Sequence, residues 1–336
     1  MDHSEIDIAI SSVIQAFPSL LERMAAEFEI LTGRRVKHPL SGVELKNAGR
    51  QLRDFANVLK QLGQLYEKPL TPKIASELIH VLNQMCRLTL RRIPRDREPI
   101  EYVIQQVKLQ SEIPSALEVL PEGLDYKSKH VGLQDFVSEV VVASDSSKID
   151  TFLQGSITER QLVAQFQRVF NELSLPREFR KFPTKITLTS AEKVKLALRD
   201  VTADWEALVN LVYGLQLLKQ GREATWTSVR KVALRSKITA LRQDPRLIPI
   251  AKEEWVTVRN SLNHGWAFFD PKNEVMQFPD RSRRVSWPFR QAFYEGIDAY
   301  LANMAMFKIW SFINTARMKA LETQLAWVRE IASQSE

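Results

Sequence analysis

The sequence predicts a mostly α-helical protein, and three observations support this prediction. Only 11 of the 336 residues are glycine. Long segments carry apolar residues three and four positions apart, which is the period of one face of an α-helix. Prolines interrupt these segments where helices are expected to begin or end. We therefore expect a helical bundle in the N-terminal region and a C-terminal helical domain with a short β-hairpin insertion.

Residues 1–125 are expected to form an N-terminal helical region with a regulatory or recognition role. Long helices are predicted over residues 6–31, residues 43–66 and residues 71–92. The third has the clearest start, because Thr71 suits the N-cap and Pro72 suits the first turn. Long helices joined by short connections are typical of a bundle. A change of organisation follows at four prolines, Pro94, Pro99, Pro114 and Pro121.

Residues 126–188 are interpreted as a helical connecting region. Helical spacing is found over residues 133–143, and a capped helix is predicted over residues 158–173. The serine-rich residues 144–147 indicate a turn between them. Pro176 and Pro183 bracket a basic segment that is interpreted as the connection to the next domain.

Residues 189–336 are expected to form the second domain. A capping box is predicted at Thr189, and Gly221 is expected to end the helix that follows. The expected core positions of that helix are Trp205, Leu208, Leu211, Val212 and Leu215. Further helices are predicted over residues 226–241, 250–263 and 288–331. Residues 266–269 and 275–278 flank a turn and predict the β-hairpin, and residues 280–284 are expected to form a loop.

The segment Arg259-Asn260-Ser261-Leu262-Asn263-His264, followed by Gly265, carries the candidate chemistry. Five positions along a continuous helix turn a side chain through about 500°, so Arg259 and His264 would point apart unless the helix ended between them. Gly265 can adopt the left-handed conformation that closes a helix, which would place His264 at the cap and beside Arg259. Asn260 lies four residues before His264 and is expected to hydrogen-bond its ring and fix the tautomer.

These residue types suit cleavage of RNA without a metal. A histidine can take the proton of a 2′-hydroxyl or protonate the leaving 5′-oxygen, which contributes about 10²–10⁴-fold in rate. The guanidinium of Arg259 would bind the phosphate and stabilise the charge of the transition state. One histidine supplies either the acid or the base. Two copies of the site across a two-fold axis would supply both, so a homodimer is expected.

The pattern of Arg259, Asn260 and His264, with four residues between the arginine and the histidine, resembles the signature of the HEPN superfamily of ribonucleases. The order of elements over about residues 190–320 also resembles that superfamily, with the motif at the end of a helix, a short two-stranded excursion and a long final helix. The resemblance implies a dimeric, metal-independent endoribonuclease of the toxin or phage-defence kind. It implies that Arg259 and His264 are catalytic, that Asn260 supports them, and that an inhibitor or a defence-complex partner restrains the activity.

Basic residues are compatible with RNA as the partner. Lysine and arginine number 47 against 40 aspartate and glutamate, a formal net charge of +7. This excess suits an acidic partner without requiring one. The predicted RNA-binding residues are Arg281, Arg283 and Arg284, which follow the motif, and Arg230 and Lys231, from a segment that also carries Arg235 and Lys237. The alternative for each group is a solubilising surface.

Other classes of function are disfavoured. The sequence has no glycine-rich phosphate loop and no serine or cysteine nucleophile motif. Cys86 is the only cysteine and the five histidines are isolated from one another, so Cys86 is expected in a core and neither a metal site nor a cofactor is expected. No apolar stretch reaches about 18 residues, and the N-terminal residues are acidic. A cytoplasmic protein without a membrane partner is therefore expected.

Two alternatives to the nuclease stay open. The first is a catalytically inactive helical adaptor, or scaffold, whose second domain dimerises or binds partners in a defence complex. The second is an RNA-binding protein that does not cleave. The aromatic residues of the final helix, from Phe289 to Trp310, do not distinguish these, since they are more typical of core or dimer packing than of base stacking.

Overall fold

The computed structural model describes most of residues 54–113, residues 124–157 and, apart from Ser282, residues 176–334. The helices predicted over residues 6–31 and 158–173 lie outside the described residues, as does much of the helix predicted over residues 43–66. Contacts divide the chain into two compact units. The first comprises residues 1–110 together with Arg317–Glu336, and the second comprises Ser111–Ala316.

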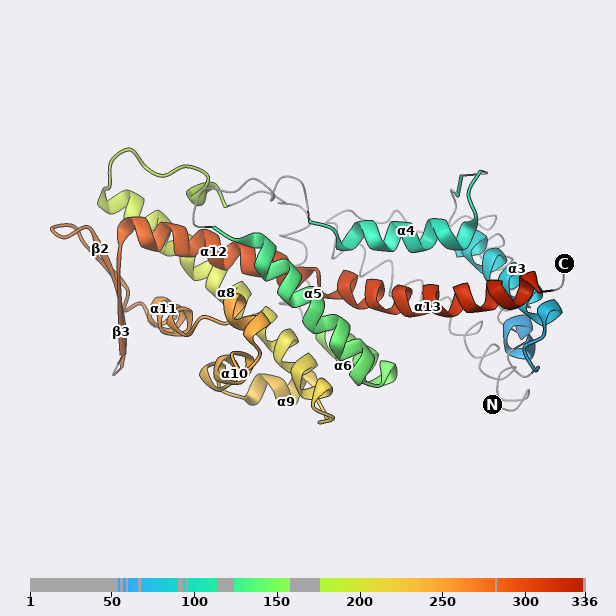
Figure 1. Ribbon diagram of the computed structural model, residues 1–336. Coiled ribbons are helices and arrows are strands. Elements are labelled where there is room, and N and C mark those ends of the chain that lie inside the picture. Colours follow the sequence, from blue (N-terminus) through green and yellow to red (C-terminus); the bar gives the residue numbers. More distant parts are fainter. Residues whose placement is uncertain are drawn as a thin grey trace, which may run out of the picture. The chain divides into compact units, whose positions relative to one another are not determined.

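The prediction of a mostly α-helical protein is confirmed (Figure 1). The α-helices are α3 (Pro72–Thr89), α4 (Pro99–Ser111), α5 (Tyr126–Ala143), α6 (Ser146–Ile157), α8 (Leu188–Lys219), α9 (Trp226–Lys231), α10 (Leu234–Leu241), α11 (Glu253–Asn263), α12 (Phe289–Phe307) and α13 (Ile309–Ser333). Two 3-10 helices, η2 (Arg177–Phe179) and η3 (Pro245–Ile250), and three strands, β1 (Phe268–Asp270), β2 (Val275–Asp280) and β3 (Arg283–Pro288), are also present, and residues 60–65 are helical.

Among the described residues, the first unit contains the helical residues 60–65, α3, α4 up to residue 110 and α13 from Arg317 onward. Apolar side chains of α3 pack with Val328 of α13 in one cluster. Cys86 packs with Ile100, Ile104 and Leu325 in another, which confirms its expected core position. Burial raises the pKa of the Cys86 thiol. The part of α13 from Arg317 onward, which the sequence predicted in the second domain, therefore supplies core residues to the first unit.

Helix α8 is the central helix of the second unit, and α12 packs against it (Figure 1). All five predicted core positions of α8 are completely buried, at Trp205, Leu208, Leu211, Val212 and Leu215. Gly214 lets α8 approach the ring of Phe152 from α6, because a Cβ at this position would lie 1.9 Å from that ring. Asn303 of α12 donates a hydrogen bond to the carbonyl of Val201 in α8 at 2.9 Å. The core of the second unit thus surrounds α8.

Two predicted helix ends, at Thr71–Pro72 and at Gly221, agree with the structure, and a third is displaced. Pro72 begins α3, and the Oγ1 atom of Thr71 accepts a hydrogen bond from the backbone N–H of Ile74 at 3.3 Å. Gly221 follows α8 with a φ of 73°. The predicted start of α8 at Thr189 is wrong by two residues. Thr187 is the N-cap and forms a capping box with Ser190, because a serine at the third position completes the box as a glutamate would.

Two helices predicted as continuous are each divided in two. The segment over residues 226–241 forms α9 and α10, which are separated by the extended residues Val232 and Ala233. The final helix is interrupted at Lys308, between α12 and α13, where the ammonium donates to the carbonyl of Glu112 at 2.7 Å. Apolar spacing did not reveal these breaks, because a break of one or two residues leaves the pattern on both sides intact.

The predicted hairpin is part of a three-stranded antiparallel sheet in the order β1-β2-β3. The pairing of β1 with β2 agrees with the prediction. The loop predicted over residues 280–284 is wrong, since Arg283 begins β3 and pairs with Asp280. This edge strand was missed because most of its side chains are exposed and several are polar. Arg281 has a φ of 52°, which suits the tight turn between β2 and β3.

A charged cap in the second unit predicts a pH-dependent stability. The carboxylate of Asp244 caps η3 and accepts hydrogen bonds from Arg246, which hold its pKa below its usual range. The contribution of this carboxylate to the free energy of unfolding is complete above its unfolded pKa of about 4. It is lost as the pH falls through the lower pKa of the folded state. Asp244→Asn keeps the cap and removes the charge. We expect it to lower the free energy of unfolding by about 1 kcal/mol at pH 7.

Urea unfolding of the wild type and of Asp244→Asn at pH 7 and at pH 3 checks this expectation. The difference between the two proteins should narrow at pH 3, because the wild-type carboxylate is then largely protonated in the unfolded chain and increasingly in the folded chain. An equal difference at both pH values would contradict the assignment of this carboxylate.

Candidate functional site

The motif helix α11 ends where the sequence predicts. His264 is its C-cap, and Gly265 has a φ of 70°. The backbone N–H of Gly265 donates to the carbonyl of Leu262 at 3.2 Å, and that of Trp266 donates to the carbonyl of Ser261 at 2.9 Å. These are the two hydrogen bonds of a Schellman motif, the closure that a left-handed glycine permits. The helix therefore ends at the position that makes His264 its C-cap residue.

The imidazole of His264 is open to solvent and lies against one neighbouring ring. It stacks on the indole of Trp266, with 4.7 Å between ring centroids and 26° between planes. The residue as a whole is exposed. An exposed histidine at a helix end can reach a ligand, as general acid–base catalysis requires.

Arg259 is held by a carboxylate that the sequence did not indicate. Its guanidinium forms an ion pair with Glu206 of α8, and both side chains are about one quarter exposed, at 25% and 27%. Its Nη1 donates to the side-chain oxygen of Asn260 at 3.0 Å. Its Nε is buried without a hydrogen-bond partner among the described residues. The guanidinium is thus occupied by protein groups, and a phosphate would have to compete with Glu206 for it.

Asn260 has different partners from the one predicted. It was expected to orient the ring of His264. Instead, its amide oxygen accepts from Arg259, and its amide nitrogen donates to the carboxylate of Asp280 at 3.0 Å. The distance in sequence explains the error, because Asp280 reaches Asn260 only through the return of β2 beside α11. Asn260 therefore links the motif helix to the sheet.

The end of α11, the turn between β2 and β3 and Arg235 of α10 line an open pocket of about 320 Å³. Its lining is polar and carries three guanidinium groups, one carboxylate and one imidazole. The lining residues are Arg235, Asn260, His264, Asp280, Arg281 and Arg283. The size is at the lower end for small-ligand sites, and the excess of guanidinium groups suits a phosphate. Arg259 is not part of this lining.

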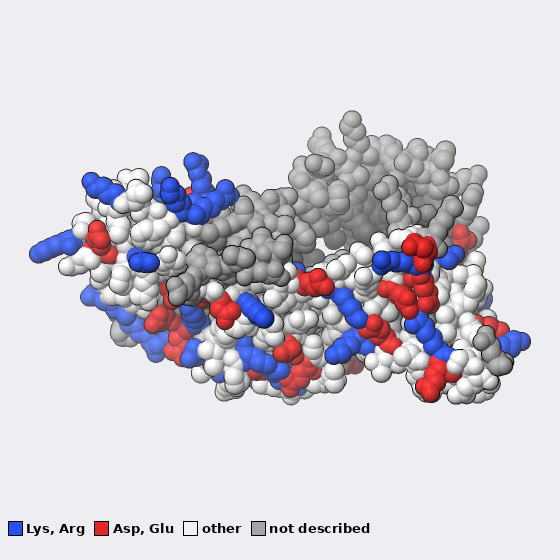
Figure 2. Space-filling model, turned by 45° about the horizontal axis from the view of Figure 1, so that its top comes forward, with Lys and Arg blue, Asp and Glu red and all other residues white. Residues whose placement is uncertain are grey.

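Of the predicted RNA-binding residues, Arg281 and Arg283 line the pocket with His264. Arg283 lies opposite Asp280 in the sheet, and Arg284 lies opposite Pro279. Successive side chains of a strand point to opposite faces, so Arg284 is directed away from the pocket. Arg230 and Lys231 are exposed in the last turn of α9 and are also outside the lining. On the face shown in Figure 2, Lys and Arg side chains gather at the left, over the end of the second unit that carries the sheet.

Arg235, Asp280 and Glu206 belong to this region but were not predicted as site residues. Arg235 was noted only as part of a basic segment, and its Nη2 donates to the hydroxyl of Thr257 in α11 at 3.2 Å. Its neighbour in that segment, Lys237, is buried and donates to Asn210 at 2.6 Å, so it has a role in packing. One basic segment thus supplies both a site residue, Arg235, and a core residue, Lys237. Residue type alone does not predict which of the two is buried.

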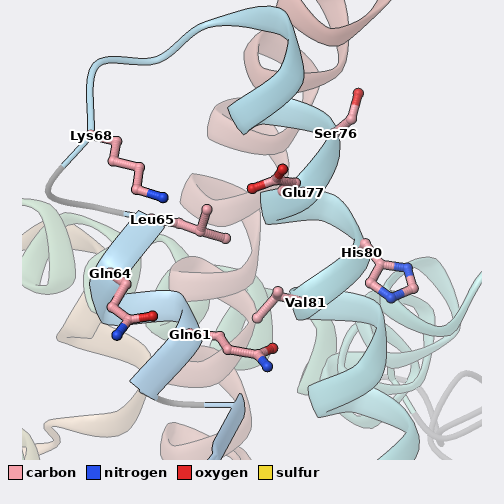
Figure 3. Close-up of a pocket in the computed structure, with 8 residues that line it drawn as sticks. All are labelled: Gln61, Gln64, Leu65, Lys68, Ser76, Glu77, His80 and Val81. Carbon is pink, nitrogen blue, oxygen red and sulfur yellow. The ribbon is translucent and has the colours of Figure 1, made fainter.

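A second pocket, of about 480 Å³, lies in the first unit (Figure 3). Its walls come from two helical segments, residues 60–65 and α3, and from the connection between them. Leu65 and Val81 supply its apolar side chains, and the remainder of the lining is polar, with Gln61, Gln64, Lys68, Ser76, Glu77 and His80. The single ammonium of Lys68 is accompanied by the carboxylate of Glu77. This pocket therefore lacks the cluster of guanidinium groups found beside His264.

Comparisons with known proteins add no family. No protein-family model, no curated protein and no solved structure matches the chain. Within the described residues, no group of three His, Cys, Asp or Glu residues is placed to hold a metal ion. None of the described helices combines the length and the apolar character that crossing a membrane requires.

Proposed function

We propose that the second unit binds RNA at the pocket beside His264 and cleaves it without a metal, as HEPN ribonucleases do. One observation carries the proposal. An exposed imidazole at the end of α11 lines the same pocket as Arg235, Arg281 and Arg283. A general acid or base and several phosphate-binding groups therefore share one small site, which is what phosphodiester cleavage requires.

The proposed roles follow from the contacts. His264 accepts the proton of the 2′-hydroxyl as a base or donates a proton to the leaving 5′-oxygen as an acid. Arg281 and Arg283 bind the phosphate from the sheet, and Arg235 binds it from α10. Arg259 retains its proposed catalytic role only if Glu206 releases its guanidinium, because the ion pair occupies it. Asn260 supports the site by joining Arg259 to Asp280.

A second copy of the chain completes the proposed reaction. One His264 serves as either the acid or the base, so a homodimer with two such residues at one phosphate would supply both. The resemblance to HEPN proteins further supports a toxin or antiviral-defence role, a regulatory function for the N-terminal region and restraint by an inhibitor or a defence-complex partner.

The chemistry of the products tests the proposal. We expect the purified full-length protein to cleave a mixed-sequence RNA in EDTA and to leave 2′,3′-cyclic phosphate and 5′-hydroxyl ends, because the 2′-hydroxyl is the nucleophile. DNA and 2′-O-methyl RNA of the same sequence should remain intact. Gel separation with chemical analysis of the ends provides the measurement. Cleavage of RNA, DNA and 2′-O-methyl RNA at similar rates would refute the proposal. So would a failure to cleave any of the three once bound partners have been removed from the protein.

A second function, RNA binding without cleavage, is favoured by the ion pair between Arg259 and Glu206. A guanidinium neutralised by a carboxylate contributes little to the stabilisation of a transition-state phosphate. In that case Arg281 and Arg283 would still bind phosphates, and binding would weaken steeply with salt as counterions are released. Salt-sensitive binding that persists in His264→Ala, with no products from the wild type, would identify this second function.

A further inference from the structure

Two exposed aromatic side chains lie next to the proposed site. The indole of Trp266 is 43% exposed and the ring of Phe268 is 49% exposed, although both are large and apolar. Ala267 between them is buried, as expected of an extended segment whose side chains alternate between two faces. Trp266 and Phe268 therefore point to the same side of the chain as it enters β1.

The space around this segment is open. A Cβ added at Gly265 would meet no atom within 4 Å. The indole of Trp266 nevertheless has a defined position, because it stacks on the ring of His264 at 4.7 Å. The imidazole covers one face of the indole, so a planar group would bind on the opposite face, one ring away from the histidine that lines the cationic pocket.

We propose that Trp266 is a base-stacking residue of this site, so that the site takes an unpaired nucleotide with its base on the indole and its phosphate among Arg281, Arg283 and Arg235. This inference rests on the proposed function and specifies its substrate as single-stranded RNA. Aromatic platforms beside basic grooves bind single strands with little sequence preference, since every base has a π-face. Paired bases are already stacked within a duplex and are not available to the indole.

The charge of the pocket favours this occupant over a second protein surface. Three guanidinium groups lie in the pocket with one carboxylate. A second copy meeting this face through a two-fold axis would bring the same cationic groups together. An acidic strand between the copies would offset that repulsion, so a dimer and a bound strand are compatible.

Binding of uncleavable oligonucleotides tests the inference separately from catalysis. We would measure the affinity of the full-length protein for a single-stranded 2′-O-methyl oligonucleotide and for an abasic oligonucleotide of equal length. Trp266→Ala should bind the first about 10-fold more weakly than wild type and the second equally well, because stacking needs a base. Trp266→Phe should retain most of the affinity. Trp327→Ala is the matched control, since it removes an indole that is 57% exposed on α13.

The outcomes distinguish the alternatives. Unchanged affinity in Trp266→Ala, equal losses on both oligonucleotides, or no binding by the wild type would overturn the inference. A loss of dimer in Trp266→Ala without a base-specific loss of binding would assign the indole to a contact between copies and would also overturn it. RNA cleavage with Trp266-independent binding would remove the stacking role and leave the proposed function standing. Trp266-dependent binding without cleavage would support the stacking role and refute the proposed cleavage of RNA.

Discussion

His264→Ala is expected to slow RNA cleavage by about 10²–10⁴-fold, the contribution of one general acid or base. The imidazole is exposed at the C-cap of α11 and lines the cationic pocket. Its removal takes away the proton-transfer group without opening a core cavity. Since backbone hydrogen bonds close the helix, the free energy of unfolding should change by about 0.5 kcal/mol or less. Initial rates on a fluorescent RNA in EDTA, together with urea unfolding, measure both quantities.

A second exposed histidine provides the control. His80 lines the pocket of the first unit, where its ring makes a hydrogen bond with Gln84 at 3.1 Å. His80→Ala removes the same chemical group from a pocket without the guanidinium cluster, so its cleavage rate should equal that of the wild type. If His264→Ala also cleaved at the wild-type rate, the imidazole would have no part in the reaction. If both variants lost activity equally, a general effect on the protein would be indicated.

The features that sequence alone predicted well depend on neighbouring residues. Gly265 closes α11 because a left-handed residue is needed immediately after the last turn, and only the local chain takes part. The core positions of α8 follow from periodicity in the same way. The start of α8 was displaced by two residues because Thr187 and Thr189 both have a capping hydroxyl. Local chemistry thus predicts that a helix begins there, but tertiary packing selects between near-equivalent ends.

The partners of the site residues could not be predicted, because they come from distant parts of the chain. Glu206 lies on α8, and it meets Arg259 only once α11 has packed against that helix. Asp280 contacts Asn260 from strand β2, which lies beside α11, and accepts from the amide that was expected to orient His264. Arg283 lines the pocket and Arg284 does not, because successive side chains of strand β3 point to opposite faces. Residue spacing identified the motif, but the electrostatic environment of Arg259 is a property of the tertiary structure.

Trp205→Ala is expected to lower the free energy of unfolding of the second unit by about 3–5 kcal/mol. Trp205 is completely buried, and its ring meets that of Trp255 edge to face at 5.4 Å. Its Nε1 donates to the carbonyl of Ile250 at 2.8 Å, and the substitution would leave this carbonyl without that donor. Urea unfolding followed by circular dichroism measures the change. Trp327→Ala, which removes an exposed indole, should change the free energy by about 0.5 kcal/mol or less. A comparably small change in Trp205→Ala would contradict the packing described for α8.

The same substitution separates the position of α11 from the chemistry at its end. Trp205 binds the segment before α11 through Ile250, and Trp255 anchors α11 to α12 by donating to Glu295 at 2.7 Å. Loss of Trp205 should therefore loosen the helix that presents His264, while every pocket residue is retained. Cleavage per folded molecule, measured at low temperature where Trp205→Ala is still folded, should fall if the reaction requires a fixed α11. If this rate equalled that of the wild type, the pocket would position His264 independently of the two tryptophans, and the stability of α11 would matter only through the fraction of folded protein.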